Sequence, residues 1–583
     1  MQGPSEVLKQ FVLCLLAGLL TLALARPVQA QSYGASLGFL SLPVETVNVI
    51  IANPRSDKSY NDKVTDGLRK YLAVYPGDYF NPAVADFAIA KARRSPDIDN
   101  ITYAFALGRA GGLDVTFTIT LAEKGKGFKG QGYLITNNLA DLPVLYDKDG
   151  TFVRAKLEAL SLTYANNNAW FGQPDKMLAG NPLVQGKPAG AGYSQWLEGY
   201  LHYGLYGITP INDKFYVYGG LSAISSGSTG QELFTNRTRG YTFFEDAYAG
   251  FVTGTTDAKG NRLAFNFSAG RQKFQLANGF LIANTAANGW NRAALQANAR
   301  WAADLLVLAQ LRYNNTKLEA FYVEPDELPV INTNTGLAGV NIEARPIPGL
   351  MTAASYVTAL KGNFAYYGPT GEVIGTRDGL NVYDLRATYT PKPLSQPGPF
   401  FGLEGAIQNH RDFDMFATAG YAEAGYSFVD KPWSPSVSYR IAYFSGDDPN
   451  TKTYERWDPL LSGGNGEQWV QGSSMFKVVQ DTNVLAQRIE SHFRPLPTVE
   501  VVPQLWAFTA PSRDNLGGNP ALSFLDGDNY GYEGNVTVKW FPNRNWYVHG
   551  MLAYTVPGGA VQDALNDNAK DWFAAMLFVR YAL

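Results

Sequence analysis

Short segments that alternate apolar and polar residues recur along residues 151–583, which is the pattern of β-strands with one apolar and one polar face. Residues 383–389 read YDLRATY, so the tyrosines, leucine and alanine share one face while Asp384 and Arg386 lie on the other. The same period of two runs through RAALQANARW at residues 292–301, where small or apolar residues alternate with arginines and amides. We therefore expect residues 292–301 to form a strand as well.

The connections between these segments are of two kinds. Some are short and polar, such as residues 212–213 and 346–349, whereas others are long and rich in Gly, Asn and Pro, such as residues 169–194, 314–333 and 445–481. Short turns on one side and long loops on the other are typical of outer-membrane barrels. We expect a mostly β fold, a transmembrane antiparallel β-barrel of about 18 strands, an even number as in single-chain bacterial barrels. The alternatives, a secreted β-sandwich or propeller, need no tyrosine-rich apolar face on nearly every strand.

The polar faces carry charges, and a charge that faces lipid costs roughly 2–4 kcal/mol at mid-membrane. These faces must then line a water-filled lumen, although many of the charges are also expected to pair across strands. Acids are interleaved with bases among them, which favours a polar, amphoteric channel over a strongly anion-selective one. The candidate lumen residues read from strand parity are Arg312, Glu343, Arg345, Asp384, Arg386, Arg440, Arg488, Glu490 and Arg494.

Arg271 departs from the alternation. Leu263, Phe265 and Phe267 share a face, and strict period two puts Arg271 on that same lipid side. Gly270 is a natural position for a β-bulge that would reset the parity. We expect either a bulge at Gly270 or a position for Arg271 at the loop end of the strand, above the membrane.

The N-terminus reads as a secretory signal peptide over residues 1–30. Lys9 precedes an apolar run at residues 11–24, and Val28-Gln29-Ala30 fits a small-x-small cleavage site. The only cysteine, Cys14, lies inside the apolar run, so the mature chain is expected to lack cysteine. No later apolar run reaches the length of a membrane helix. These features predict export to the bacterial outer membrane.

After a linker at residues 31–43, residues 44–125 predict a small α+β domain. A strand at residues 44–51 precedes two helices, the second beginning at Asn81-Pro82, and an alternating hairpin follows. The order β-α-α-β-β with YPGDYFNPAVADFAIAKARRSPDIDNITYAFA resembles a POTRA (polypeptide-transport-associated) module, which implies a periplasmic domain that binds partners by strand addition. The alternative is a domain that caps or plugs the barrel. Residues 126–150 are expected to be a second linker.

Two phrases of the barrel region, FFEDAYAGF and SAGRQKFQLANGFLI, resemble the alginate-export family of outer-membrane porins. The resemblance covers most of residues 151–583. It implies export of a secreted polysaccharide, with outer-membrane lipid around the barrel and periplasmic or inner-membrane export and synthesis proteins docked on the N-terminal domain. The positions carried over as cargo-binding are Asp246, Arg271, Arg292, Arg300 and Arg312.

Arginine forks bind carboxylates in a bidentate manner, so the arginines suit an anionic polymer such as a polyuronate. Two other functions stay open. A POTRA-barrel pore for protein translocation or insertion is one, since Thr238–Tyr241 (TRGY) resembles a motif of that superfamily, although it falls early in the barrel. A passive porin for small solutes is the other. The net charge of −3 gives no reason to expect nucleic acid as a partner.

An enzyme is not expected, and neither is a metal or another cofactor. The 4 histidines form no metal-binding spacing, and no GxSxG nucleophile motif occurs. Glu245 and Asp246 are adjacent, so strict alternation points them to opposite faces and argues against a glycosidase pair. A long loop at residues 451–479, with Tyr454, Arg456, Trp457 and Trp469, is expected either to fold into the pore or to cover its mouth.

Overall fold

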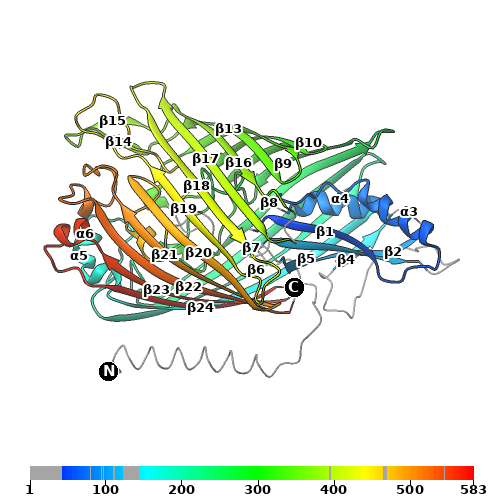
Figure 1. The fold of residues 1–583 in the computed structure, drawn as a ribbon, viewed down its shortest axis with the longest axis horizontal. Coiled ribbons are helices and arrows are strands. Elements are labelled where there is room, and N and C mark those ends of the chain that lie inside the picture. Colours follow the sequence, from blue (N-terminus) through cyan, green and yellow to red (C-terminus); the bar gives the residue numbers. More distant parts are fainter. Residues whose placement is uncertain are drawn as a thin grey trace.

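The computed structural model describes residues 42–582 apart from 79, 94, 96, 109–111, 123–143, 393–395, 464–468, 470 and 544. In this part of the chain, 18 antiparallel strands close into one barrel, with β24 pairing along β5 (Figure 1). The expected fold class is confirmed. The barrel strands are β5 (Thr151–Asn167), β6 (Tyr193–Pro210), β7 (Phe215–Gly230), β8 (Arg239–Thr256), β9 (Arg262–Arg271), β10 (Leu305–Tyr313), β11 (Thr316–Glu324), β12 (Gly336–Ile347), β13 (Leu350–Lys361), β16 (Leu380–Tyr389), β17 (Gly398–His410), β18 (Ala417–Ser427), β19 (Ser436–Phe444), β20 (Val484–Leu496), β21 (Val499–Thr509), β22 (Asn529–Asn543), β23 (Trp546–Pro557) and β24 (Trp572–Ala582).

One end of the barrel carries short turns and the other carries long loops, as expected. Residues 314–333 are an exception, because they were expected to be one long loop. Asn314 and Asn315 instead form a two-residue hairpin turn, with Asn314 at a φ of 48° that asparagine tolerates, and β11 follows. The long loops contain the short elements η1 (Ala169–Gly172), α5 (Pro174–Met177), η2 (Trp290–Arg292), η3 (Pro329–Ile331), β14 (Ala365–Tyr367), β15 (Val373–Thr376), η4 (Met475–Lys477), η5 (Pro520–Leu522) and α6 (Gly559–Ala564).

The alternation within β16 is found as expected. Leu385 is 68% exposed and Tyr383 is exposed beside it, whereas Asp384 and Arg386 are buried on the other face. Because an apolar outer face and a polar inner face recur from strand to strand, the outside of the barrel suits lipid and the charges gather inside. No helix in the described part of the chain is long and apolar enough to cross a membrane.

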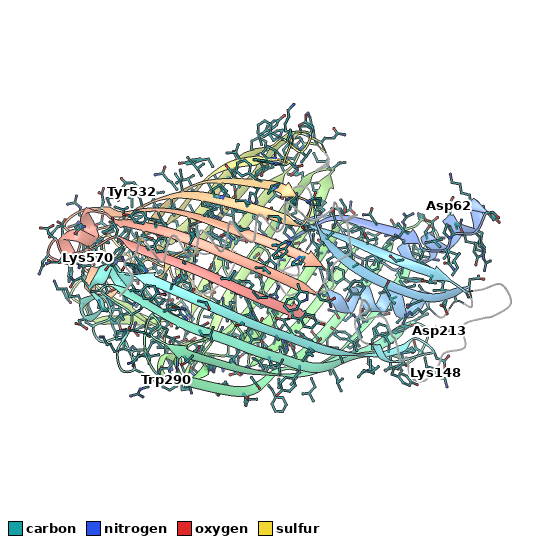
Figure 2. All side chains as sticks on the ribbon, turned by 90° about the horizontal axis from the view of Figure 1, so that it is seen from below. Asp62, Lys148, Asp213, Trp290, Tyr532 and Lys570 are labelled. Carbon is teal, nitrogen blue, oxygen red and sulfur yellow. The ribbon has the colours of Figure 1, made fainter. Side chains whose placement is uncertain are left out.

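An N-terminal domain precedes the barrel and lies at the end that carries the short turns (Figures 1 and 2). Its three-stranded sheet has the order β1-β3-β2, with β1 parallel to β3 and β2 antiparallel to it. Leu68, Phe105 and Phe117 are buried in its core. The elements are β1 (Val44–Ile51), α3 (Lys58–Arg69), α4 (Pro82–Ala92), β2 (Ile98–Leu107) and β3 (Leu113–Leu121).

The second helix of this domain begins where the Asn81-Pro82 signal predicts it. The Asn81 side-chain oxygen accepts a hydrogen bond from the Val84 backbone N–H at 3.4 Å, which is the contact of an N-cap residue. Proline follows at the first helical position. A backbone N–H at this position would have no acceptor within the helix, so the helix loses no hydrogen bond to proline. The order β-α-α-β-β expected for this segment is present in the structure.

The domain is in direct contact with the mouth of the barrel. Lys91 Nζ donates to the Asp213 carbonyl at 2.8 Å in the β6–β7 turn, and the Thr256 hydroxyl donates to the Lys70 carbonyl at 2.7 Å. The Phe87 ring of α4 packs edge-on against Tyr216 of β7, with centroids 5.2 Å apart. These contacts match the alternative expectation of a domain that caps the barrel.

Two expected segments lie outside the described residues. The signal peptide at residues 1–30 is one of them, and nearly all of the linker at residues 31–43 is the other. Of the second expected linker, residues 126–143 also lie outside. The remainder was expected to be linker, but it forms β4 (Val144–Lys148), which pairs with the start of β5. Here the chain joins the sheet earlier than its composition suggested.

Candidate functional site on the inner face of the barrel

A β-bulge brings two neighbouring carboxylates to the inner face of β8. Leu221 pairs with Ala247 and Ala223 pairs with Phe244, so the single residue Ser222 opposes both Glu245 and Asp246. Strict alternation had placed these two carboxylates on opposite faces, and that expectation is wrong. The extra residue rotates the backbone locally, so both side chains turn away from lipid.

The two carboxylates have separate partners. Asp246 accepts hydrogen bonds from the Tyr206 hydroxyl and from Ser222 Oγ, the latter at 2.6 Å. Glu245 Oε1 accepts the backbone N–H groups of Trp301 and Ala302 at 2.7 and 2.9 Å. The pair therefore supports the inner wall and a loop that lies against it.

That loop is residues 272–304, between β9 and β10, and we name it the first inner loop. Residues 292–301 within it were expected to form a strand, but they are a 3-10 turn followed by irregular chain. Positive φ angles at Ala293, Ala294 and Asn298 interrupt any extended run. The alanines are buried at even and odd positions alike, because the whole segment is enclosed by the barrel rather than paired in its sheet.

Side-chain oxygens on the barrel wall accept hydrogen bonds from backbone N–H groups of the first inner loop. In a strand, a neighbouring strand would accept these bonds. Glu198 Oε2 of β6 accepts from the Gln296 and Ala297 N–H groups at 2.9 and 2.8 Å, and Ser228 Oγ accepts from Ala294 at 2.8 Å. Buried backbone donors need such partners. Glu198 and Glu245 were missed by sequence analysis because nothing local marks a strand carboxylate as a loop acceptor.

The three arginines carried over from the loop region by the family resemblance all hold this loop in place. Arg271 forms ion pairs with Asp304 and Asp326. Arg292 Nη2 lies 2.7 Å from Asp326 Oδ1. Arg300 is 1% exposed, and its guanidinium donates to the Ile224 carbonyl at 3.1 Å. Burial lowers the pKa of Arg300 from its ordinary value, although Glu245 opposes this shift.

The position of Arg271 explains how this residue avoids facing lipid although it departs from the alternation. It is the last residue of β9, at the loop end, as one of the two expectations required. Gly270 before it has a φ of 125°, a conformation that a residue with a Cβ rarely adopts, although the pairing of β9 with β8 and β10 shows no register shift there. The guanidinium thus turns inward without an extra residue.

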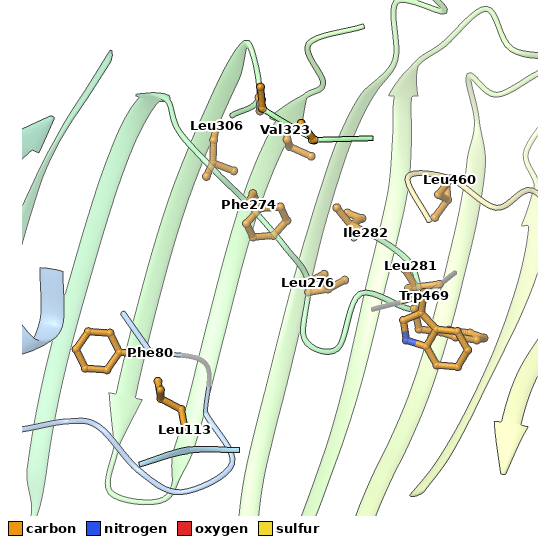
Figure 3. Close-up of a cluster of buried hydrophobic side chains, with 14 of the residues drawn as sticks. Phe80, Leu113, Phe274, Leu276, Leu281, Ile282, Leu306, Val323, Leu460 and Trp469 are labelled. Atoms are coloured by element: carbon orange, nitrogen blue, oxygen red, sulfur yellow. The ribbon is translucent and has the colours of Figure 1, made fainter. Parts of the chain in front are cut away.

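A second inner loop, residues 445–483 between β19 and β20, meets the first one. The Ala283 N–H donates to the Leu461 carbonyl at 2.9 Å, and the Phe280 and Trp469 rings lie 4.9 Å apart. Figure 3 shows Leu281 and Ile282 of the first loop near Leu460 and Trp469 of the second. Of the two possibilities for this long loop, the inward one is therefore found.

One wall carboxylate and one carboxylate of the loop itself hold the second inner loop in place. Glu533 of β22 accepts the backbone N–H groups of Ser474 and Met475 at 2.9 and 3.0 Å. Asp458 of the loop lies 2.7 Å from Arg377 Nη2 and accepts the Tyr366 hydroxyl at 2.7 Å. The loop is consequently fixed at two points, one at Asp458 and the other at Ser474 and Met475.

Two clusters of charge line the wall of the barrel. In the first, Arg386 lies 2.7 Å from Asp384 and 3.3 Å from Glu343, and Lys317 lies 3.2 Å from Glu343. These residues come from β11, β12 and β16 and are partly or fully buried. The cluster contains three of the residues chosen from strand parity.

The second cluster lies on β18–β21. Arg488 lies 2.9 Å from Glu423 and 3.1 Å from Glu490, and Arg494 lies 3.1 Å from Glu500. The Arg440 guanidinium stacks over the Trp469 ring at 4.4 Å, so this cluster touches the second inner loop. Acids and bases alternate in both clusters, which is the amphoteric pattern expected.

Arg312 and Arg345 have a different role, because both bind a residue of the N-terminal domain. Asp78 lies 2.6 Å from Arg312 Nη2 and 2.7 Å from Arg345 Nη2. A second ion pair joins Asp86 of α4 to Arg154 of β5. Burial raises the pKa of Asp86, although Arg154 opposes this shift.

A cavity of about 460 Å³ separates the N-terminal domain from the first inner loop. Asp78 and Phe80 of the domain line one side, Gln272 and Phe274 of the loop line another, and wall residues such as Tyr206 complete it. The channel thus contains a chamber bounded by the domain and by a loop. No cluster of residues suited to a metal ion occurs in the described ranges.

The closed 18-stranded barrel with an apolar outside and a charged inside defines the class, an outer-membrane β-barrel of the porin type. The family model described as alginate export matches residues 226–575, more than half of the sequence, and the chain belongs to that family. The match includes the β8 bulge, both inner loops and both charge clusters. No curated protein matches the chain.

Solved structures that resemble this chain include several proteins of Pseudomonas aeruginosa. OccK7 (OpdD) is 10% identical, with 74% of this chain and 98% of that chain covered and a TM-score of 0.44. OpdK, solved with vanillate, is 11% identical, with 74% and 98% covered and a TM-score of 0.43. The outer membrane protein OprD is 13% identical, with 74% and 94% covered and a TM-score of 0.40.

Proposed function

We propose that the protein is an outer-membrane channel that exports a secreted exopolysaccharide, and that the polymer carries carboxylates. The observation that carries this proposal is the pair of charge clusters on the inner wall, in a chain of the alginate-export family. Guanidinium groups bind carboxylates in a fixed geometry. The carboxylates beside them keep each contact shallow, so that a polymer can leave as well as enter.

The cargo-binding residues in this proposal are those whose side chains stay on the wall when the loops move. We assign this role to Arg386 and Glu343 in the first cluster and to Arg440, Arg488 and Arg494 in the second. Asp384 and Glu490 are their acidic partners. Because Arg271, Arg292 and Arg300 hold the first inner loop, they serve closure rather than binding.

The N-terminal domain in this proposal lies in the periplasm and docks the synthesis or export machinery. The element order of POTRA modules supports it, and so does the sheet order β1-β3-β2, which leaves β1 and β2 as edges. An edge strand offers unpaired backbone groups for strand addition by a partner.

The test is single-channel conductance of the purified full chain in a planar bilayer, with a polyuronate, a neutral glucan and an unfolded polypeptide as blockers. We expect block by polyuronate, and a rise of about three- to tenfold in its half-blocking concentration in Arg488→Gln. Lys431→Gln is the matched control, because Lys431 is exposed in the β18–β19 turn. Block by the polypeptide alone would contradict the proposal and favour protein translocation, and indifference to all three would favour a passive porin.

A further inference from the structure

A tight turn of the N-terminal domain presents one carboxylate to the barrel. Residues 75–78 read YPGD, and the Asp78 N–H donates to the Tyr75 carbonyl at 3.1 Å. Pro76 occupies the second turn position and Gly77, with a φ of 85°, the third, as in a type II turn. The turn therefore fixes the direction in which Asp78 points.

Asp78 reaches two guanidinium groups from neighbouring parts of the wall. Its Oδ2 lies 2.6 Å from Arg312 Nη2 on β10, and its Oδ1 lies 2.7 Å from Arg345 Nη2 on β12. A Cβ added at Gly77 would come within 3.1 Å of Arg345 Nη2, so the turn fits closely against the barrel. One carboxylate thus binds two arginines at once.

The two arginines have more hydrogen-bonding capacity than Asp78 uses. Arg312 Nη1 and Arg345 Nη1 are both buried, and neither has a hydrogen-bond partner among the described residues. A guanidinium offers five N–H donors in a planar fork. The site could therefore bind a carboxylate together with adjacent hydroxyl groups, which is the chemistry of a uronate sugar.

The charge of the adjoining cavity depends on the domain. Among the lining residues of the cavity, five are acidic and five are basic. Two of the acids, Asp78 and Asp86, belong to the domain, whereas the five bases all belong to the barrel and its loop. When the domain leaves, the chamber that remains carries five bases against three acids and becomes positive.

We propose that Asp78 occupies a carboxylate site of the barrel in place of a uronate group, so that an anionic polysaccharide releases the N-terminal domain from the channel mouth by competing for Arg312 and Arg345. This inference rests on the proposed function and extends it. Binding of the cargo then opens the channel mouth through which the cargo enters. A neutral polysaccharide lacks the competing group and leaves the domain docked.

The energetics follow from differential binding. A ligand shifts a two-state equilibrium only by the difference between its affinities for the two states. A uronate binds both guanidinium groups only in the undocked state, because Asp78 occupies them in the docked state. A polymer presents many such groups in sequence, so its effective concentration at the site stays high after the first contact.

The experiment measures the distance between the domain and the barrel in the full chain, in lipid nanodiscs. Spin labels are placed at Lys63→Cys on α3 and Lys259→Cys in the β8–β9 turn, both exposed positions. The sequence has only Cys14, within the expected signal peptide, so few other sites compete for label. A polyuronate oligomer and a neutral glucan oligomer of equal length are the probes.

We expect the polyuronate to move the distance distribution from one short population to a broad, longer one, and the glucan to leave it unchanged. Asp78→Asn should raise the undocked fraction about tenfold or more without any sugar, because it removes one partner of a buried ion pair. Asp62→Asn, on the exposed face of α3, is the matched control and should behave as the parent chain.

The same samples are also tested for conductance block, which separates two kinds of failure. Block by polyuronate with an unchanged distance distribution would overturn the inference and leave the proposed function standing. Absence of both block and release would mean that the proposed function itself is wrong. An Asp78→Asn chain that stays docked would overturn the role of Asp78 whatever the cargo.

Discussion

Single carboxylates on the barrel wall act as acceptors for pairs of backbone amides in the inner loops. Glu198 and Glu245 each accept two consecutive N–H groups, and Glu533 accepts those of Ser474 and Met475. A charged acceptor makes a stronger hydrogen bond than a neutral one. One side chain can therefore replace the pairing that a strand would have supplied.

We predict that Glu245→Ala releases the segment around Trp301. The substitution leaves two buried N–H donors without an acceptor, at about 1–3 kcal/mol for each. Hydrogen exchange of the Trp301 and Ala302 amides should therefore speed up by about 30-fold or more. Glu245→Gln keeps one acceptor and should show a smaller effect. Equal exchange in all three proteins would show that the contact does not hold the loop.

At the scale of the element, strand β16 offers a direct test of which face meets lipid. Leu385→Arg places a charge on the exposed face at the middle of the strand, where it should cost about 2–4 kcal/mol of folding free energy in a bilayer. Tyr389→Arg lies on the same face at the turn end, where the cost should fall to about 0–1 kcal/mol. Denaturant titration of refolding in vesicles measures both. Costs near zero for both would contradict the assigned orientation, and equal large costs would contradict the assigned depths of the two residues.

The second inner loop carries a pH-sensitive group. Asp481 is buried next to Ser462, whose hydroxyl donates to it at 3.2 Å, and burial raises its pKa to about 7. In the released loop the group should return to its ordinary pKa. Since the folded pKa is the higher one, the stabilisation is complete at low pH and is lost as the pH rises through about 7.

We therefore predict that the second inner loop opens more often at pH 8 than at pH 5. Hydrogen exchange corrected for its intrinsic pH dependence, or conductance recorded over the same range, measures this. Asp481→Asn is neutral at every pH and should flatten the profile. A profile with the same slope in both proteins would assign the dependence to another group.

At the scale of the whole molecule, we infer that the channel has two closures in series. The N-terminal domain closes the turn end through Asp78 and Asp86, and the two inner loops close the space beyond the chamber. When two constrictions lie in series, the larger resistance dominates the total resistance to ion flow. Release of either closure alone should consequently change the conductance little.

We predict a non-additive double-mutant cycle for the conductance. Asp78→Ala alone and Glu198→Ala with Glu245→Ala should each raise the single-channel conductance slightly, whereas the combined variant should raise it by more than the sum of the two. Four purified proteins in the same bilayer suffice for the measurement. Additive increments would show that the domain and the loops lie on separate paths.

Sequence patterns sufficed for the fold class of the barrel, because period-two alternation and turn residues are local signals, although they missed β11 inside residues 314–333. They also located β1 and α4, and they gave the loop-end position of Arg271 as one of two alternatives. Residues 292–301 show that such local signals can mispredict a strand. An alanine-rich segment that packs inside a closed wall has the same alternation as a strand, and only its long-range acceptors distinguish the two.

The sequence predicted several of the residues that line the candidate site, but it did not predict which residues they bind. Strand parity placed Asp384, Arg386 and Arg488 on the buried face. It could not reveal that Arg312 and Arg345 bind Asp78, which is more than 230 positions away from either. The bulge at Glu245 was hidden for a related reason, since an inserted residue is visible only in the register of the neighbouring strand.

The closure of β24 onto β5 has a consequence for assembly. The seam joins the last described strand to the first long one, so the cylinder stays open until β24 is available. The contacts of the N-terminal domain described above go to β5–β12, the first half of the sheet. The domain can therefore settle on this half before the seam forms. It would act as a template that sets the curvature of the unfinished sheet and shields its charged face until the remaining strands arrive.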